Sequence, residues 1–157
     1  MIVVVMGVSG SGKTTIGEKL AQRLGWPFIE GDDYHPRENV AKMAAGIPLD
    51  DDDRWPWLDR LNERLHTQRD AIVTCSALKE SYRRRLLKGI ADARLVYLEG
   101  ARELIASRVQ TRKHKYMPAS LLDSQFQTLE PPREAIRIDV AQPIERSVDA
   151  IVGALKP

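Results

Sequence analysis

The segment 7–14 carries residues whose types and spacing suit a phosphate-binding site. It reads GVSGSGKT and matches G-x-x-x-x-G-K-[ST] at every fixed position. Its glycines permit backbone turns that aim N–H groups at phosphate oxygens, and a following helix adds the positive end of its dipole. Lys13 would meet the β- and γ-phosphates, and the Thr14 hydroxyl would ligate Mg²⁺. A glycine-rich turn without function is the alternative. The residues expected to bind ATP here are Gly7, Val8, Ser9, Gly10, Ser11, Gly12, Lys13, Thr14 and Thr15.

Carboxylates and an imidazole follow in the segment 30–36, EGDDYHP. Phosphoryl transfer needs an acceptor hydroxyl held in line with the γ-phosphate, and a carboxylate is the usual group that accepts its proton. Asp32 or Asp33 could be this base. Strand alternation would place Glu30 on the same face as Asp32, where it could hold a Mg²⁺-bound water. A solvated acidic turn is the alternative for this segment.

Two further charged regions suit a kinase. Residues 37–54 contain Arg37, Lys42, the acidic run 50–53 and Arg54 among apolar side chains, and we expect a packed flap there. Its basic groups would suit an anionic, hydroxyl-rich substrate, because a guanidinium binds a carboxylate through two hydrogen bonds. A solvated charged face is the alternative for each of these residues.

The second charged region lies near the end of a predicted helix, where basic residues are crowded from Arg108 through the run 112–115. Such a cluster could close over ATP as a lid, neutralise charge on the transferred phosphoryl group and exclude water. The alternative is that these cations complement the negative end of the helix dipole.

The elements that must position these groups alternate between strands and helices. The apolar run Ile2–Met6 predicts a strand buried on both faces, and apolar residues at four-residue spacing predict a helix over Lys13–Leu24 that stops at Gly25. The other expected strands are Pro27–Glu30, Ala71–Cys75, Leu95–Leu98 and Ile136–Val140. The other expected helices are Pro36–Ala45, Arg54–Arg69 with Asp53 as its N-cap, Glu80–Lys88, Arg102–Thr111 and Ile144–Leu155. Five strands with alternating helices predict an α/β fold, a doubly wound parallel sheet flanked by helices.

Length and composition bound the class of protein. A chain of 157 residues fits one domain, 1–157, with the flap at about 35–70 and the lid region at about 108–130. The net charge of +2 is too small and dispersed to indicate a nucleic-acid partner. The apolar run at the N-terminus is too short for a membrane span, so we expect a cytoplasmic protein. The single cysteine, Cys75, lies in an apolar strand and is expected to be a buried structural thiol.

Five ordered blocks resemble the gluconate kinases, a family of P-loop small-molecule kinases. They are MGVSGSGKTT, EGDDYHP, NVAKMAAGIPLDDDDRWPWL, CSALKESYRRRL and SQFQTLEPP, and together they cover nearly the whole chain. The resemblance implies transfer of the γ-phosphate of ATP to the 6-hydroxyl of D-gluconate with Mg²⁺, by a homodimer in the cytoplasm. The sequence differs from the family around KHKYMPASLL, where members often carry an aromatic pair after the histidine.

The resemblance also implies roles for individual residues. Asp32 would be the base for the acceptor hydroxyl, with Lys13 and two lid arginines as the other catalytic groups. The implied sugar-acid contacts are Asp32, His35, Lys42, Arg54 and Arg83, the lid arginines are Arg108 and Arg112, and Gln142 with Pro143 would hold adenine. The metal would be held by Thr14 and, through water, by Glu30.

Two other functions are weighed against this expectation. A shikimate kinase would be expected to show D-x-D after the second strand and a glycine-rich turn after the third, where this chain has EGD and CSA. A nucleotide-dependent switch that transfers no phosphate belongs to a different class. A GTPase should carry D-x-x-G and [NT]-K-x-D, and the chain has neither.

Overall fold

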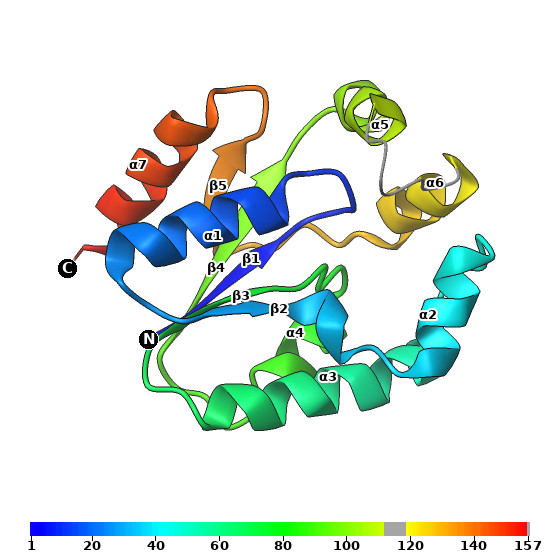
Figure 1. Cartoon of the computed structure of the whole chain (residues 1–157), viewed down its shortest axis with the longest axis horizontal. Coiled ribbons are helices and arrows are strands. Elements are labelled where there is room, and N and C mark those ends of the chain that lie inside the picture. The colour runs from blue at the N-terminus through cyan, green and yellow to red at the C-terminus, as the bar shows by residue number, and fades with distance from the viewer. Residues whose placement is uncertain (112–118, 157) are drawn as a thin grey trace.

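A computed structural model describes residues 1–111 and 119–156, and its core is a five-stranded parallel sheet in the order β2-β3-β1-β4-β5 (Figure 1). The strands are β1 Ile2–Met6, β2 Phe28–Glu30, β3 Ala71–Thr74, β4 Ala93–Glu99 and β5 Ile136–Asp139. β1 is central and buried at all five residues, which agrees with its unbroken apolar sequence. It pairs with β3 from Ile2 opposite Ala71 and with β4 from Ile2 opposite Ala93. The fold is therefore the parallel α/β class that the sequence predicts.

Helices cover both faces of this sheet. They are α1 Lys13–Leu24, α2 Arg37–Ala44, α3 Asp51–His66, α4 Glu80–Leu86, α5 Arg102–Thr111, α6 Ala119–Thr128 and α7 Ile144–Leu155. In Figure 1, α1 and α7 lie on one face and α3 and α4 on the other, while α2, α5 and α6 lie toward the carboxyl ends of the strands. None of the helices in the described part of the chain is both long and apolar enough to cross a membrane.

The parallel arrangement brings three connecting segments to one edge of the sheet. The loop after β1, the segment after β2 and the residues after β3 all leave from carboxyl ends, and β2, β3 and β1 are neighbours. The chain leaves β1 toward β2 and β3 on one side and later passes to β4 and β5 on the other. Ligands in open α/β sheets bind outside the carboxyl ends where the direction of winding changes. The phosphate loop therefore lies where such a fold binds ligands.

Several predicted boundaries are confirmed. The helix Lys13–Leu24 has the predicted limits, and Gly25 ends it in the left-handed region with φ of 69°. The strand Ile2–Met6 and the helices Arg102–Thr111 and Ile144–Leu155 also have the predicted limits. Cys75 is 1% exposed, and burial raises the pKa of its thiol to about 12. The interpretation of Cys75 as a buried structural thiol is confirmed.

The predicted N-cap of α3 is wrong. The cap is Asp50, whose carboxylate accepts a hydrogen bond from Asp53 N at 2.8 Å, while the Asp53 carboxylate accepts one from Asp50 N at 3.0 Å. These reciprocal bonds form a capping box that satisfies two backbone donors, so the helix begins three residues before the predicted Arg54. All four residues of the run 50–53 are aspartates, and composition alone does not distinguish the cap among them.

The segment after β2 is also not a continued strand. Residues Gly31–Tyr34 form a 3-10 helix, η1, so the alternation argument for Glu30 and Asp32 fails. A Cβ at residue 31 would lie 1.9 Å from the Thr74 carbonyl oxygen, so only glycine allows this close approach to β3. A second difference is the helix α6, which is not predicted and lies within the expected lid region at about 108–130.

The capping box of α3 predicts the effect of removing its first residue. We expect Asp50→Ala to lower the free energy of unfolding by about 1 kcal/mol, because the backbone N–H of Asp53 loses its acceptor. Asp52→Ala is the matched control, since Asp52 is an exposed residue of the same first turn, and it should cost less than about 0.5 kcal/mol. Urea unfolding of both variants measures the difference, and equal losses would contradict the capping role.

Candidate active site

The phosphate loop joins β1 to α1 in a conformation that depends on glycine. Gly10 and Gly12 have φ of 83° and 98°, and a Cβ on Gly10 would lie 2.4 Å from Val109 Cγ2. Lys13 Nζ donates to the carbonyl oxygens of Gly7 and Val8, each at 3.1 Å. The loop therefore wraps around the ammonium group at the N-terminus of α1, where backbone N–H groups and the helix dipole favour an anion.

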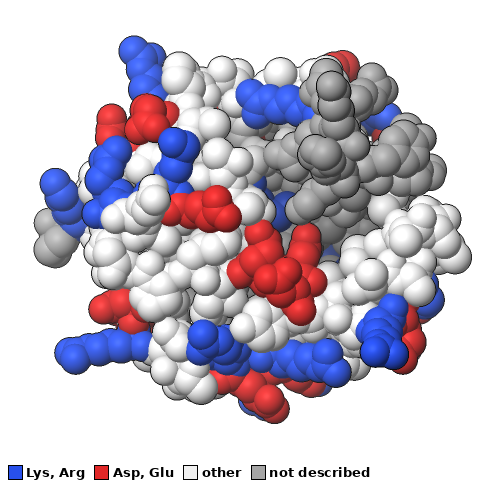
Figure 2. Space-filling model, in the orientation of Figure 1, with Lys and Arg blue, Asp and Glu red and all other residues white. Residues whose placement is uncertain are grey.

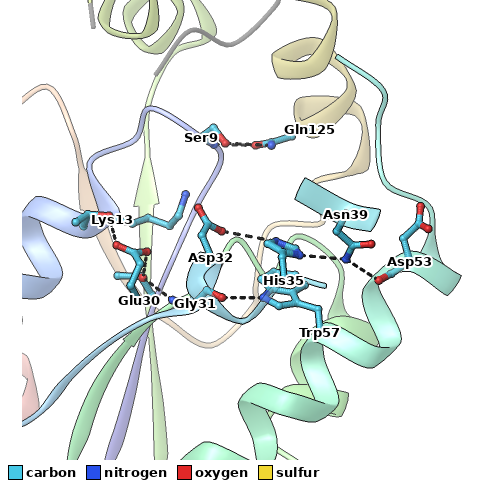
Figure 3. Close-up of polar contacts among 12 residues, drawn as sticks. Ser9, Lys13, Glu30, Gly31, Asp32, His35, Asn39, Asp53, Trp57 and Gln125 are labelled. Atoms are coloured by element: carbon cyan, nitrogen blue, oxygen red, sulfur yellow. Dashed lines mark hydrogen bonds and ion pairs between the residues drawn. The ribbon is translucent and has the colours of Figure 1, made fainter. Parts of the chain in front are cut away.

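The Glu30 carboxylate connects this loop to two strands (Figure 3). Thr14 Oγ1 donates to Glu30 Oε2 at 2.6 Å, and Thr74 Oγ1 donates to Glu30 Oε1 at 2.5 Å. The Thr74 hydroxyl also accepts a hydrogen bond from Gly31 N at 3.2 Å. The two residues expected to hold the metal therefore contact each other directly, and Glu30 reaches Thr14 from the end of β2 and not through alternation with Asp32.

A cavity beside the loop brings together the groups of the predicted reaction. Its volume is about 50 Å³, and its polar lining includes Lys13, Asp32 and Arg54. Its other lining residues are Ser9, His35, Met43, Pro48, Leu49, Trp57, Ser76, Leu78, Leu121, Ser124 and Gln125. Figure 2 shows acidic side chains gathered near the centre of the face where η1 lies in Figure 1. Lys13, Asp32 and Arg54 are all expected from the sequence to belong to the site. The structure places all three in the wall of this one cavity.

His35 lies in the wall of this cavity and is held by aromatic stacking. Its ring lies 4.0 Å from the Trp57 ring, with an angle of 19° between their planes, and the side chain is 3% exposed. Trp57 Nε1 donates to Gly31 O at 2.8 Å, which fixes the indole against the segment that carries Asp32. Burial lowers the pKa of His35 from 6.5 to about 4, while Asp32 raises it and Arg54 lowers it. The imidazole is therefore neutral at pH 7.

Arg54 forms another part of the wall. It is 9% exposed, and its Nη1 donates to Leu49 O at 2.7 Å and to the Tyr82 hydroxyl at 2.9 Å. The Tyr82 hydroxyl in turn donates to the Asp51 carboxylate in a short hydrogen bond. Burial first, and then this hydrogen bond, raise the pKa of Tyr82 to about 12, so the phenol stays protonated and continues to donate. These contacts hold a buried positive charge at the cavity.

A second cavity lies on the other side of the phosphate loop. Its volume is about 280 Å³, and loop residues Gly10 and Gly12 line it together with Arg108 and Gln142. Arg108 Nη2 donates to Val140 O at 2.7 Å, which places the guanidinium beside the turn after β5. Pro143 is the N-cap residue of α7 in the same turn. The predicted lid arginine and the predicted adenine segment therefore meet next to the phosphate loop.

Other predicted residues lie elsewhere. Lys42 Nζ forms an ion pair with Asp53, at 2.9 and 2.8 Å from its two carboxylate oxygens, and does not line the cavity of about 50 Å³ beside the phosphate loop. Arg83 is buried and donates to Ala77 O at 2.7 Å and Glu130 O at 2.9 Å, in the wall of a separate cavity of about 710 Å³. Arg112 lies outside the described residues.

Gln125 contacts the phosphate loop, although no sequence motif predicts a role for it. Its Oε1 accepts a hydrogen bond from Ser9 N at 2.7 Å, and its Nε2 donates to Ser9 Oγ at 3.1 Å (Figure 3). This pair links α6 to the loop across 116 residues of sequence. The only signal in the sequence is the block SQFQTLEPP, which marks a segment without indicating which residue acts.

A phosphate loop after the central strand β1 of a parallel sheet, with an acidic segment after β2 at the same edge, defines a P-loop kinase fold. The comparisons with known proteins agree with this class and narrow it. A family model described as an AAA domain matches residues 2–132. A probable gluconokinase from Xenopus tropicalis is 42% identical over 175 residues, which cover 99% of this chain and 92% of that protein. The chain belongs to the gluconokinase family.

Solved structures support the same placement. A gluconokinase of known structure, from Sinorhizobium meliloti 1021, is 48% identical in sequence to this chain. The match covers 98% of this chain and 90% of the gluconokinase chain, with a TM-score of 0.91. A shikimate kinase from Bacteroides thetaiotaomicron is 19% identical and covers 99% of this chain and 98% of its own, with a TM-score of 0.74. The second likeness shows the fold alone, so the shikimate kinase alternative is not favoured.

The buried neutral imidazole predicts a pH dependence of stability. Because the pKa of His35 is near 6.5 in the unfolded chain and about 4 in the folded protein, the unfolded state binds more protons between these values, and stability falls as the pH drops through this window. His35 accounts for a loss of at most about 3 kcal/mol in the free energy of unfolding. We expect His35→Gln to flatten the dependence in urea unfolding from pH 6.5 to 4. His66→Gln, at an exposed histidine, is the control for the loss of a histidine, and equal flattening in both variants would contradict the role of His35 burial.

Proposed function

We propose that this protein transfers the γ-phosphate of ATP to the 6-hydroxyl of D-gluconate, giving 6-phospho-D-gluconate and ADP. The observation that carries the proposal is the acceptor cavity, in which Lys13, Asp32 and Arg54 line one space. These are a phosphate-binding cation, a carboxylate base and a cation that suits the carboxylate of a sugar acid. The gluconokinases at 42% and 48% identity supply the identity of the sugar acid.

The cavity supports a direct in-line transfer. The 6-hydroxyl oxygen attacks the γ-phosphorus, the bond from that phosphorus to the oxygen of the β-phosphate breaks, and ADP leaves. Asp32 takes the proton of the attacking hydroxyl. Lys13 stabilises the negative charge of the transferred group, and its ammonium is already held at the start of α1 by Gly7 and Val8.

Arg54 orients the acceptor in this proposal. A guanidinium binds a carboxylate through two parallel hydrogen bonds, so the C1 carboxylate of gluconate lies at Arg54 while the 6-hydroxyl lies toward Asp32 and Lys13. The arginine is fixed by Leu49 O and the Tyr82 hydroxyl. Such fixing reduces the ordering cost of binding. Lys42 and Arg83, which line no part of this cavity, stay predictions from the family resemblance.

The loop and the second cavity support the nucleotide site. The residues Gly7 to Thr15 would bind the phosphates, and the cavity of about 280 Å³ lined by Gln142 and Arg108 would take the nucleoside, with Pro143 beside it. Arg108 and Arg112 are proposed as lid arginines that neutralise charge on the phosphates.

Magnesium is proposed as the metal cofactor. The described residues hold no group of three or more carboxylate, histidine or cysteine side chains suited to a metal. Mg²⁺ needs none, because in kinases it is bound by few protein groups, by phosphate oxygens and by water. The Thr14 hydroxyl with the Glu30 carboxylate 2.6 Å from it fits that donor set, Thr14 as direct ligand and Glu30 through a bound water. When bound, Mg²⁺ neutralises charge on the β- and γ-phosphates.

The size of the acceptor cavity implies movement on binding. A volume of about 50 Å³ holds only a few water molecules, so gluconate must displace part of the wall. Gln125 and Leu121 of α6 belong to that wall, as do Met43 and Pro48 on the flap side. We infer that the flap at about 35–70 and the lid at about 108–130 open to admit the substrates.

Assembly and location follow from the family resemblance. We propose a homodimer that acts in the cytoplasm on a small sugar acid, with neither a nucleic acid nor a membrane as partner. Light scattering during gel filtration measures the mass in solution, and a monomer at micromolar concentration would contradict the dimer.

Removing the proposed base should stop the chemistry while nucleotide binding persists. We expect Asp32→Asn to lower kcat by about 10²- to 10⁴-fold, because an amide cannot accept the hydroxyl proton. ATP binding by calorimetry should be unchanged. A coupled ADP-release assay measures kcat, and Asp33→Asn on the same segment serves as the control. An unchanged kcat for Asp32→Asn would remove Asp32 from the mechanism.

Neutralising the proposed carboxylate contact should affect the acceptor alone. We expect Arg54→Gln to raise KM for gluconate about 10- to 100-fold, since hydrogen bonds to charged groups contribute about 1.5–3 kcal/mol, while KM for ATP stays the same. Arg60→Gln is the matched control, at an exposed arginine of the same helix. The assay should include gluconate, shikimate and uncharged polyols. A preference for a polyol in the unaltered enzyme would overturn the sugar-acid substrate.

A further inference from the structure

Asn39 lies behind the acceptor cavity and is connected to it through His35. It belongs to the first turn of α2, is 2% exposed, and is not among the residues that line the cavity. Its Nδ2 donates to Asp53 O at 2.8 Å and lies 3.1 Å from His35 Nδ1 (Figure 3). A buried amide with two partners on different segments fixes both of them.

The identity of these partners determines where the imidazole carries its proton. The Asp53 carbonyl oxygen only accepts hydrogen bonds, so the NH₂ group of Asn39, and not its oxygen, must face it. The second hydrogen of the same NH₂ group then points at His35 Nδ1. An atom that accepts this hydrogen bond carries a lone pair, so a neutral ring must carry its hydrogen on Nε2.

The surroundings of the ring keep it neutral and in place. The groups that face it are Asp32 from η1, Asn39 from α2, and Arg54 and Trp57 from α3. Burial of the ring and the positive charge of Arg54 disfavour a second proton, and the stack on Trp57 holds the ring in place. Its Nε2 lies 3.8 Å from Asp32 Oδ1, so the N–H group points toward the carboxylate proposed as the base.

We propose that Asn39 is a positioning residue of the phosphoryl transfer, because it holds His35 in the Nε2–H tautomer that presents a hydrogen-bond donor to Asp32. The donor draws one carboxylate oxygen toward the ring and leaves the other to accept the proton of the acceptor hydroxyl. In the opposite tautomer, a lone pair on Nε2 would face the carboxylate and repel it. The Asp32 side chain is 62% exposed, so it could then turn toward solvent. The proposal rests on the proposed function in taking Asp32 as the base.

The test combines the tautomer with the kinetics. Asn39→Asp keeps the shape of the side chain but only accepts hydrogen bonds, so it favours a hydrogen on Nδ1 of His35. We expect nitrogen and carbon NMR shifts of the ring to show the Nε2–H form in the unaltered protein and the Nδ1–H form in the variant. The variant should lose about 10- to 100-fold in kcat, the range for partners that orient a reacting group, with KM for ATP unchanged.

Asn62→Asp is the matched control for the structural cost. The Asn62 amide also donates to two backbone carbonyls, Leu86 O at 2.8 Å and Lys88 O at 2.9 Å, but it lies on the α3–α4 side away from the cavity. It should leave kcat and the His35 tautomer unchanged. If Asn39→Asp does not fold, Asn39→Ala replaces it, because removal of the donor should give a mixture of both tautomers and an intermediate loss of kcat.

Three outcomes would overturn the role of Asn39. They are an Nδ1–H or doubly protonated His35 in the unaltered protein at pH 7.5, a changed tautomer with unchanged kcat, and a lowered kcat with an unchanged tautomer. The NMR measurement needs no substrate. Failure to phosphorylate gluconate would therefore overturn the proposed function and leave the tautomer result standing, whereas an Nδ1–H ring would overturn the proposal and leave gluconate phosphorylation intact.

Discussion

The rest of the site depends on the two hydrogen bonds that the Glu30 carboxylate accepts. One oxygen accepts a hydrogen bond from Thr14 at the start of α1 and the other from Thr74 at the end of β3. Its own backbone ends β2, so one side chain links three segments, the start of α1, the end of β2 and the end of β3. Because both bonds are to a charged acceptor, they are stronger than bonds between neutral groups. The phosphate loop and the acidic segment η1 are thus held in register.

A second constraint is that polar groups in the wall of the small cavity pack against an aromatic side chain, Trp57. His35 stacks on Trp57, and Trp57 donates to Gly31 O, the residue immediately before Asp32. In such surroundings an unpaired polar group is costly, so each group must have a specific partner. Asn39 meets this requirement because its NH₂ group faces two acceptors, Asp53 O on one side and His35 Nδ1 on the other, while His35 Nε2 lies 3.8 Å from Asp32 Oδ1. The same arrangement explains why the flap carries asparagine at a buried position.

The features predictable from the sequence are those with local causes. The phosphate loop, the limits of α1 and the buried strand β1 follow from motifs and from apolar spacing within 24 residues. Other features depend on partners distant in the sequence. The 3-10 turn at Gly31 depends on contact with Thr74, 43 residues away, and the Gln125 contact spans 116 residues. The N-cap at Asp50 was missed for another reason, because four successive aspartates have the same capping propensity and only the three-dimensional geometry distinguishes them.

The contacts of the phosphate loop also explain how its hydrogen-bond donors, which suit a phosphate, are satisfied when no phosphate is bound. An N–H or ammonium group buried without a partner costs about 1–3 kcal/mol or more. Here Lys13 donates to Gly7 O and Val8 O, and Ser9 N donates to Gln125. The same donors that suit an anion are therefore satisfied by carbonyl and amide oxygens. A bound phosphate would replace the neutral bond from Ser9 N to Gln125 by a charge-assisted one, which is roughly twice as strong.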